Sequence, residues 1–167
     1  MDWTSRCHDR YKHEDGFKDA ALLGPIMEGK IYIGQDDKEL DSNTLLSKLN
    51  TEGCGAIVSF IGITRGFDQG EEVLRLEFDA WKDQLTTVLE GLAIEGIKRF
   101  NLHSVAMSHR TGSVGPGENI VAIHVASAHR KQAFEGCQWL IDELKLQAPI
   151  WKKEVKPSGE TWKAGLG

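Results

Sequence analysis

The sequence has few of the features that mark a secreted or membrane-bound protein. It contains only three cysteines, Cys7, Cys54 and Cys137, and none of them belongs to a Cys-x-x-Cys pair. An odd number of cysteines without that spacing predicts reduced, buried thiols rather than a disulfide framework, and this favours a cytoplasmic location. No stretch has the length and apolarity of a membrane span, and residues 1–10 are charged and polar, so we expect neither a secretory signal nor membrane association.

A surplus of basic residues is also lacking. The chain has 20 Lys and Arg residues against 25 Asp and Glu residues, which gives a formal net charge of −5. Affinity for a phosphate backbone is built from surplus Lys and Arg, so this balance argues against a nucleic-acid-binding protein. Any site for an anion must therefore be a local cluster of positive charge.

Common sequence patterns of nucleotide, hydrolytic and metal sites are missing. There is no Walker A sequence, no Gly-x-Gly-x-x-Gly after a predicted strand and no nucleophile elbow. Cys7, His8 and His13 lie close together, but they lack a fourth ligand at a recognised spacing. We therefore predict no metal ion and no bound cofactor.

Length and composition indicate one folded domain. The chain has 167 residues, of which 40% are hydrophobic, and this is enough for a core that needs no disulfides. Residues 1–29 mix charged residues with Gly16, Gly24 and Pro25, and we interpret them as an N-terminal extension. The folded domain is then expected at residues 30–167.

Hydrophobic patterns predict strands and helices in turn along this domain. Runs of β-branched and aromatic residues, or residues alternating in polarity, indicate strands at 30–34, 56–63, 73–81, 104–109 and 119–127. Helical spacing indicates helices at 41–49, 83–99 and His129–Gln147. We expect strand 56–63 to be central or covered on both faces and to form a long-looped hairpin with 73–81. This order favours an α+β fold, with a mainly antiparallel sheet and a long C-terminal helix, over a doubly wound parallel sheet.

Two lysines flank the predicted end of the long helix. Pro149 has no N–H and favours extended geometry in the residue before it, so the helix should end near Gln147. Lys145 then lies in the last turn and Lys152 in an extended segment, and the two ammonium groups can approach one point. A nucleophilic or acidic lysine needs its charge disfavoured, which a second ammonium group and a desolvating wall such as Trp151 can achieve.

Other basic residues follow strands or begin a helix. They are Arg65 in a glycine-rich loop, His109-Arg110 before Gly112, and His129-Arg130 at the start of the long helix. A helix N-terminus already carries a positive dipole end and free N–H groups, so added cations are unfavourable there unless an anion binds. Simpler interpretations stay open for these residues. A carboxylate can neutralise Arg130, Lys145 can complement the helix dipole, and Lys152 and Lys153 can be solvated surface charges.

Several motifs in this order resemble the large, catalytic subunit of molybdopterin synthase, the MoaE family. They are Phe60-Ile61-Gly62 leading to Arg65, His109-Arg110-Thr111-Gly112 with Gly117-Glu118, Ser127-Ala128-His129-Arg130, Ala133-Phe134, Asp142, Leu144-Lys145 and Ala148-Pro149-Ile150-Trp151-Lys152-Lys153-Glu154. The resemblance spans roughly residues 53–162.

The resemblance implies an α/β hammerhead-type fold and a homodimer with a small ubiquitin-like sulfur-carrier subunit at each end. The C-terminal Gly-Gly thiocarboxylate of that carrier would donate sulfur to cyclic pyranopterin monophosphate in two rounds, forming the dithiolene of molybdopterin. By the same resemblance, Lys145 and Lys152 would be catalytic, and Arg65, His129, Arg130 and Lys153 would bind substrate. Two other functions remain possible from the sequence: a docking module that binds the carrier tail or the pterin phosphate without turnover, and a phosphate-ester enzyme, which lacks any apparent metal-binding cluster.

Overall fold

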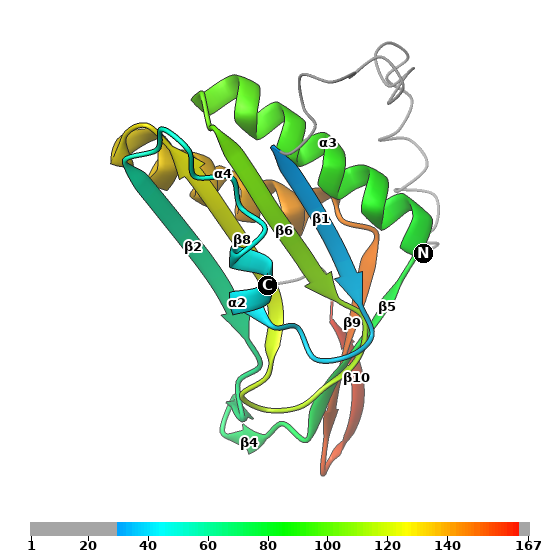
Figure 1. The fold of residues 1–167 in the computed structure, drawn as a ribbon. Coiled ribbons are helices and arrows are strands. Elements are labelled where there is room, and N and C mark those ends of the chain that lie inside the picture. The colour runs from blue at the N-terminus through cyan, green and yellow to red at the C-terminus, as the bar shows by residue number, and fades with distance from the viewer. Residues whose placement is uncertain (1–29, 164–167) are drawn as a thin grey trace.

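A four-stranded sheet forms one half of the fold (Figure 1). The computed structural model describes residues 30–163, so the predicted extension at 1–29 and its Cys7 lie outside the described residues. The sheet order is β1-β6-β8-β2, where β1 is Ile31–Asp36, β6 is Ser104–Arg110, β8 is Asn119–Ser127 and β2 is Ala56–Ile63. β1 pairs with β6 in parallel, and the other two pairs are antiparallel.

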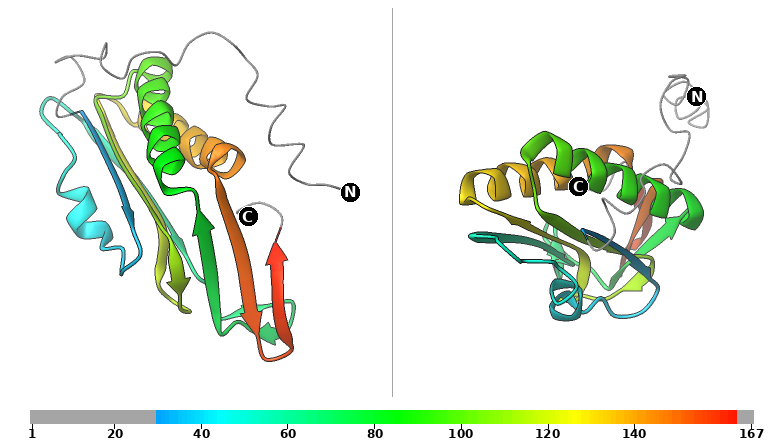
Figure 2. Two further views of the ribbon diagram at one scale, coloured as in Figure 1. Left: turned by 90° about the vertical axis from the view of Figure 1, so that its right-hand side faces the viewer. Right: turned by 45° about the horizontal axis from the view of Figure 1, so that its top comes forward.

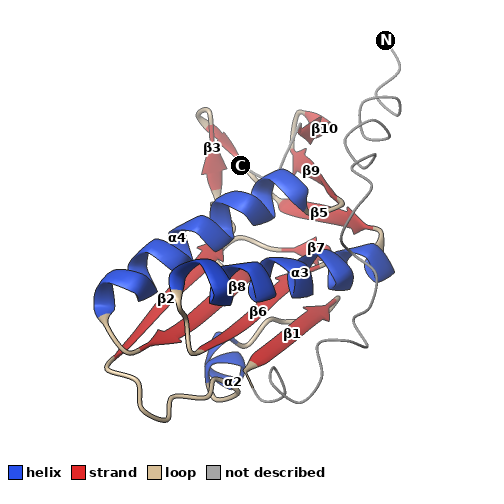
Figure 3. Ribbon diagram, turned by 90° about the horizontal axis from the view of Figure 1, so that it is seen from above, coloured by secondary structure: helices blue, strands red, loops and turns tan. Residues whose placement is uncertain are grey.

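Two long helices cover one face of this sheet, α3 (Lys82–Phe100) and α4 (Arg130–Gln147) (Figure 3). Glycines allow close packing between these helices and against the segment that follows α3. A Cβ at Gly96 would lie 3.1 Å from Cδ2 of Leu140, and a Cβ at Gly136 would lie 2.9 Å from both methyl groups of Leu102. Leu85, Leu89 and Leu140 are fully buried between helices and sheet.

The short helix α2 (Ser42–Leu46) covers the opposite face, where Leu45 packs in a second cluster with Ala106, Ala122 and Ala126. Asp41 caps this helix, because its Oδ1 accepts hydrogen bonds from the backbone N–H groups of Asn43 (2.9 Å) and Thr44 (3.3 Å).

A second, fully antiparallel sheet extends from the end of the first one (Figure 2, left). Its order is β10-β9-β5-β7, where β10 is Gly159–Lys163, β9 is Ile150–Lys156, β5 is Arg75–Ala80 and β7 is Gly112–Val114. The short pair β3 (Phe67–Asp68) and β4 (Glu71–Glu72) lies in the connection between β2 and β5. The predicted mixed α+β fold with mainly antiparallel sheets is therefore confirmed, and the long helix is followed by a hairpin.

The predicted hairpin between 56–63 and 73–81 is wrong. β2 pairs with β8, whereas β5 pairs with β9 and β7 in the other sheet. β2 is also an edge strand, with Ile57, Ile61 and Ile63 between 39% and 54% exposed, rather than a central or doubly covered strand. The long connection does not impose a register on its two strands, so their partners are decided by distant segments.

The cysteines of the described part fit the predicted reduced thiols in part. Cys137 is free and buried, and burial raises the pKa of its thiol to about 11. Cys54 is also free but only half-buried. Between residues 30 and 163, no helix combines the length and the apolarity needed to cross a membrane.

Candidate active site

Lys152 lies at the centre of a cationic cluster on one face of the second sheet. It stands directly opposite Phe78 of β5 on one side and Lys163 of β10 on the other. Directly opposite residues of antiparallel strands share one face, so the half-buried Lys152 is flanked by a buried aromatic ring and a second ammonium group. Burial lowers its pKa, the carboxylate of Glu154 partly offsets this, and the charges of Lys163, Arg65 and Lys145 lower it further.

The end of α4 brings Lys145 to this cluster as the sequence predicted. The helix ends at Gln147, and Ala148 adopts extended geometry (φ −64°, ψ 128°) ahead of Pro149. The chain then enters β9, which carries Lys152 two residues after its start. Lys145 is exposed in the last turn of α4, and its charge acts on Lys152, as does that of Arg65. Figure 3 shows this end of α4 beside β9.

Two carboxylates hold the other cations of this face. Asp68 lies 3.3 Å from Arg65, 3.4 Å from Lys156 and 4.0 Å from Lys163. Glu154 is 6% exposed and lies 3.4 Å from Lys156 and 3.3 Å from Lys163. No motif in the sequence marked Asp68, Lys156 or Lys163 as members of this cluster. Two signals in the sequence could have placed Lys152, Glu154 and Lys163 on one face. One is the alternation of side chains along β9, and the other is the turn at Pro157–Gly159, which pairs the next strand with β9.

Lys153 does not join this cluster. As the next residue of the strand it points to the opposite face, where its ammonium group lies 2.7 Å from Glu77 and 2.8 Å from Glu160 and stacks over the ring of Trp162. Hydrogen bonds from its ammonium group to Glu160 and Glu77 raise its pKa. Lys153, Glu77 and Trp162 line a cleft of about 330 Å³ together with Asp79 and Ser113.

Trp151 also lies on that opposite face, opposite Asp79, so the sequence-based idea that it walls Lys152 is wrong. Strand alternation gives this role to Phe78 instead, since Phe78 is 4% exposed and faces Lys152. The ring of His109 packs edge-on against Phe78, with centroids 5.3 Å apart.

His129 and Arg130 lie at the other end of α4, on the far side of the molecule from Lys145 (Figure 3). Arg130 and Lys145 are fifteen residues apart, or about 22 Å at the helical rise of about 1.5 Å per residue. Both His129 and Arg130 are exposed, and neither forms an ion pair with another residue of the described range 30–163. The carboxylate partner that the simpler interpretation required is thus not found among these residues. One copy of the chain does not unite the two groups of cations.

The motif around His109-Arg110 supports the fold rather than the cluster. His109 is 1% exposed and its ring Nδ1 donates to the carbonyl oxygen of Arg110 (2.7 Å). Burial lowers its pKa to about 4, so the ring is neutral at pH 7. Arg110 is buried and bonded to Glu118 (2.8 Å) and to the carbonyl oxygen of Ser113 (3.0 Å).

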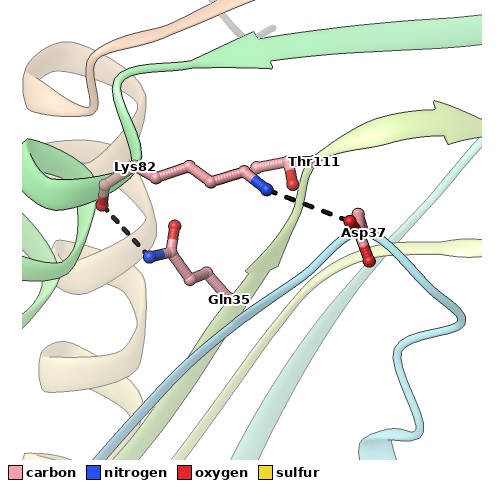
Figure 4. Close-up of a pocket in the computed structure, with 4 residues that line it drawn as sticks. All are labelled: Gln35, Asp37, Lys82 and Thr111. Carbon is pink, nitrogen blue, oxygen red and sulfur yellow. Dashed lines mark hydrogen bonds and ion pairs between the residues drawn. The ribbon is translucent and has the colours of Figure 1, made fainter.

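A separate cleft of about 230 Å³ lies at the start of α3 and is lined by Gln35, Asp37, Lys82 and Thr111 (Figure 4). Gln35 donates to the carbonyl oxygen of Lys82 (3.1 Å), and the Lys82 ammonium group lies 3.9 Å from Asp37. These contacts tie the end of β1 to α3, and none of the four residues belongs to the cationic cluster.

The chain is similar to known proteins over most of its length. The sequence model of one family, described as MoaE protein, matches residues 35–147. The molybdopterin synthase catalytic subunit of Arabidopsis thaliana is 37% identical over 133 residues, which are 80% of this chain and 67% of that protein. The molybdopterin synthase catalytic subunit of Pyrococcus abyssi is 30% identical over 138 residues, 83% of this chain and 93% of that protein.

Solved structures agree with these relatives. The crystal structure of molybdopterin synthase from Staphylococcus aureus has a TM-score of 0.72 at 26% identity and covers 81% of this chain and 96% of its own. A chain in the complex of subunits 1 and 2 of the molybdopterin-converting factor from Helicobacter pylori has a TM-score of 0.64 at 26% identity. The match covers 79% of this chain and 88% of that chain. The resemblance seen in the motifs is thereby confirmed, and the chain belongs to the MoaE family.

Proposed function

We propose that this chain is the large, sulfur-transferring subunit of molybdopterin synthase. In this role it accepts the C-terminal Gly-Gly thiocarboxylate of a small ubiquitin-like carrier and transfers its sulfur, in two rounds, to cyclic pyranopterin monophosphate. The observation that carries the proposal is the cationic cluster itself. Lys145, Lys152 and Arg65 gather on one face of a chain whose net charge is −5, and Lys152 is half-buried there with a lowered pKa.

The cluster suits an anionic donor and an anionic acceptor. A thiocarboxylate and a phosphate both need local positive charge, and the arriving anions relieve the mutual repulsion of the ammonium groups. Lys145 is exposed and acts on the terminal carbonyl of the carrier or on the pterin. Lys152 is less exposed and has a depressed pKa, so it exchanges a proton at lower pH than an ordinary lysine. It also stabilises the negative charge that develops while the carbon–sulfur bond of the carrier breaks and a carbon–sulfur bond to the pterin forms.

The partner proposed for this chain is a small subunit, as in the Helicobacter pylori complex of subunits 1 and 2. The carrier tail would reach the open side of the cluster, where Arg65 has a side chain 77% exposed. Loss of that side chain removes an anion contact without disturbing the core.

A second copy of the chain is needed to bring His129 and Arg130 into the same site. The separation of about 22 Å along α4 prevents one copy from doing so. In a symmetric dimer any contact made by one copy is repeated by the other, so the start of α4 in each copy would contribute to the cluster of its partner. This is the role we propose for the homodimer, and it leaves Lys153 outside the substrate site, in its ion pairs with Glu77 and Glu160.

Reconstitution tests the sulfurtransferase role. The protein is mixed with cyclic pyranopterin monophosphate and thiocarboxylated carrier, and molybdopterin is followed by the fluorescence of its oxidised derivative. Product that requires both additions supports the proposal. Carrier binding without product would instead support the docking-module function. Lys131, 79% exposed on the same helix as Lys145, provides the control variant, since Lys131→Ala removes a surface charge and should keep full activity.

Mixed dimers test the contribution of the second copy. Lys152→Ala and Arg130→Ala should each be inactive alone, yet a heterodimer of the two retains one intact site. Random mixing makes half of the dimers heterodimeric, so about a quarter of the wild-type activity should return. If the mixture stays inactive although heterodimers are shown to form, either Lys152 and Arg130 act in the site of the same copy or Arg130 does not belong to the site.

A further inference from the structure

Lys163 occupies a position next to Lys152 that the motifs did not indicate. It is the last residue of β10 and lies directly opposite Lys152 in the β9·β10 pair. Opposed side chains of an antiparallel pair share a face, with Cβ atoms about 5 Å apart. Among the cations that act on Lys152, Lys163 has the largest influence, ahead of Arg65 and Lys145. Figure 2 (left) shows β10, in red, as the outer strand running back along β9.

Two carboxylates contact the Lys163 ammonium group and leave part of it open to solvent. Its Nζ lies 3.3 Å from Oε2 of Glu154 and 4.0 Å from Oδ2 of Asp68. These acids are well covered, with side chains 7% and 16% exposed, whereas the Lys163 side chain is 30% exposed. The lysine is therefore held at the edge of the cluster with part of its surface open.

The charges of this face do not balance. Lys156 also acts on a third carboxylate, that of Glu71, so the pair adds no net charge. The face then has four cations (Arg65, Lys145, Lys152 and Lys163) against the two carboxylates of Asp68 and Glu154, a surplus of two positive charges among these residues. The chain as a whole carries a net charge of −5, so the surplus is a local feature. Like charges held together at a partly desolvated position repel one another, and an arriving anion relieves that repulsion.

Lys156 shows what a purely structural lysine looks like at the same two acids. Its Nζ is 3.4 Å from both Asp68 and Glu154 and also donates to the backbone carbonyl oxygen of Asp68 at 3.1 Å. Its side chain is only 13% exposed, and it lies four residues beyond Lys152 along β9. Lys156 is thus contacted by three protein oxygens, while Lys163 has two such contacts, one of them at 4.0 Å, as well as more exposure and a place beside Lys152.

We infer that Lys163 is an anion-binding residue of the sulfur-transfer site, which holds a phosphate or thiocarboxylate group against Lys152 while Glu154 and Asp68 fix its position. The inference rests on the proposed function and adds to it a residue from the C-terminal hairpin. The two anion sources share one chemistry, a negative oxygen or sulfur atom that accepts hydrogen bonds from an ammonium group, and kinetics distinguish them.

The test compares Lys163→Met with Lys156→Met in the reconstituted synthase. Both changes keep an apolar stem and remove one ammonium group from the same pair of acids. For Lys163→Met we expect the KM of one anionic substrate to rise about tenfold, the effect of losing one charge-assisted hydrogen bond. Its kcat should stay within about twofold, and Lys163→Arg should restore most of the affinity. Lys156→Met should leave both KM values unchanged.

The two KM values assign the ligand. A rise for cyclic pyranopterin monophosphate identifies the phosphate, and a rise for the thiocarboxylated carrier identifies the tail. Unchanged KM values for both substrates, or equal rises in Lys156→Met and Lys163→Met, would overturn the inference. If the wild-type protein forms no product with both substrates present, the proposed function itself has failed, and the two failures are thus distinguished before any variant is measured.

Discussion

Acid should destabilise this fold through one buried ring, that of His109. The ring is 1% exposed, donates from Nδ1 to the carbonyl oxygen of Arg110 and packs edge-on against Phe78, the residue that faces Lys152. Burial lowers its pKa from 6.5 to about 4, although the hydrogen bond to the Arg110 carbonyl acts in the opposite direction. The neutral ring therefore supports both the second sheet and the wall of the cluster.

The size of the effect follows from proton linkage. Between pH 4 and 6.5 the unfolded chain binds a proton at this histidine and the native chain does not, so stability rises with pH in this window and is lost as the pH falls. With these two pKa values, the loss between pH 7 and pH 5 is about 2 kcal/mol, and it approaches about 3 kcal/mol near pH 4. His124, on the opposite face of the same sheet, also has its pKa lowered by burial and adds a contribution of the same sign.

Urea unfolding at pH 7 and pH 5 measures the loss, and His109→Gln isolates the part due to this ring. The free energy of unfolding of the variant should fall by about 2 kcal/mol less than that of the wild type over the same interval. His129→Gln, at an exposed position, is the matched control for the replacement of a histidine by glutamine. Equal pH slopes in wild type and His109→Gln, or an NMR titration of the native ring with a pKa near 6.5, would refute the reasoning.

Three further outcomes follow from the geometry. Lys152→Arg keeps a positive charge but cannot release its proton, so if Lys152 transfers a proton, turnover should drop by about 10²-fold or more while carrier affinity is retained; near-normal turnover would restrict Lys152 to an electrostatic role. A Cβ at Gly55 would lie 2.5 Å from the carbonyl oxygen of Ala128, so Gly55→Ala should lower the unfolding free energy by about 1–3 kcal/mol. A Cβ at Gly66 has its nearest contact at 3.7 Å, so Gly66→Ala should not lower it. Calorimetry of both variants measures the difference. Cys137, whose thiol pKa burial raises to about 11, should resist alkylation in the native protein and react only on unfolding, while the half-buried Cys54 should react first. Mass spectrometry of peptides from an alkylated Cys7→Ser variant measures the order of reaction. Equal rates at the two thiols would contradict the burial of Cys137.

Local chemistry explains what could be predicted from the sequence. Pro149 determines where α4 ends, because it blocks the helix whatever surrounds it, and the approach of Lys145 to Lys152 follows from that break. The Asp41 cap and the limits of β2 and β8 are local in the same sense, since they depend on a few consecutive side chains.

Strand partners and faces could not be predicted in this way. The choice of β8 for β2 and of β9 for β5 depends on segments more than 50 residues away. Strand alternation puts Trp151 and Lys153 on the face opposite Lys152, and the motifs alone carry no information about faces. Lys163 and Asp68 come to the cluster from a hairpin and a loop that no motif marked.

The most direct test of the central claim follows sulfur out of the carrier in a single turnover. Thiocarboxylated carrier, cyclic pyranopterin monophosphate and a slight excess of this protein are mixed, and the intact mass of the carrier is measured over time. We expect the carrier mass to fall by the difference between sulfur and oxygen as molybdopterin forms, and we expect Lys152→Ala to stop both events although the carrier still binds. Carrier that loses sulfur to the pterin equally fast with Lys152→Ala would contradict the claim that this cationic cluster carries out the transfer.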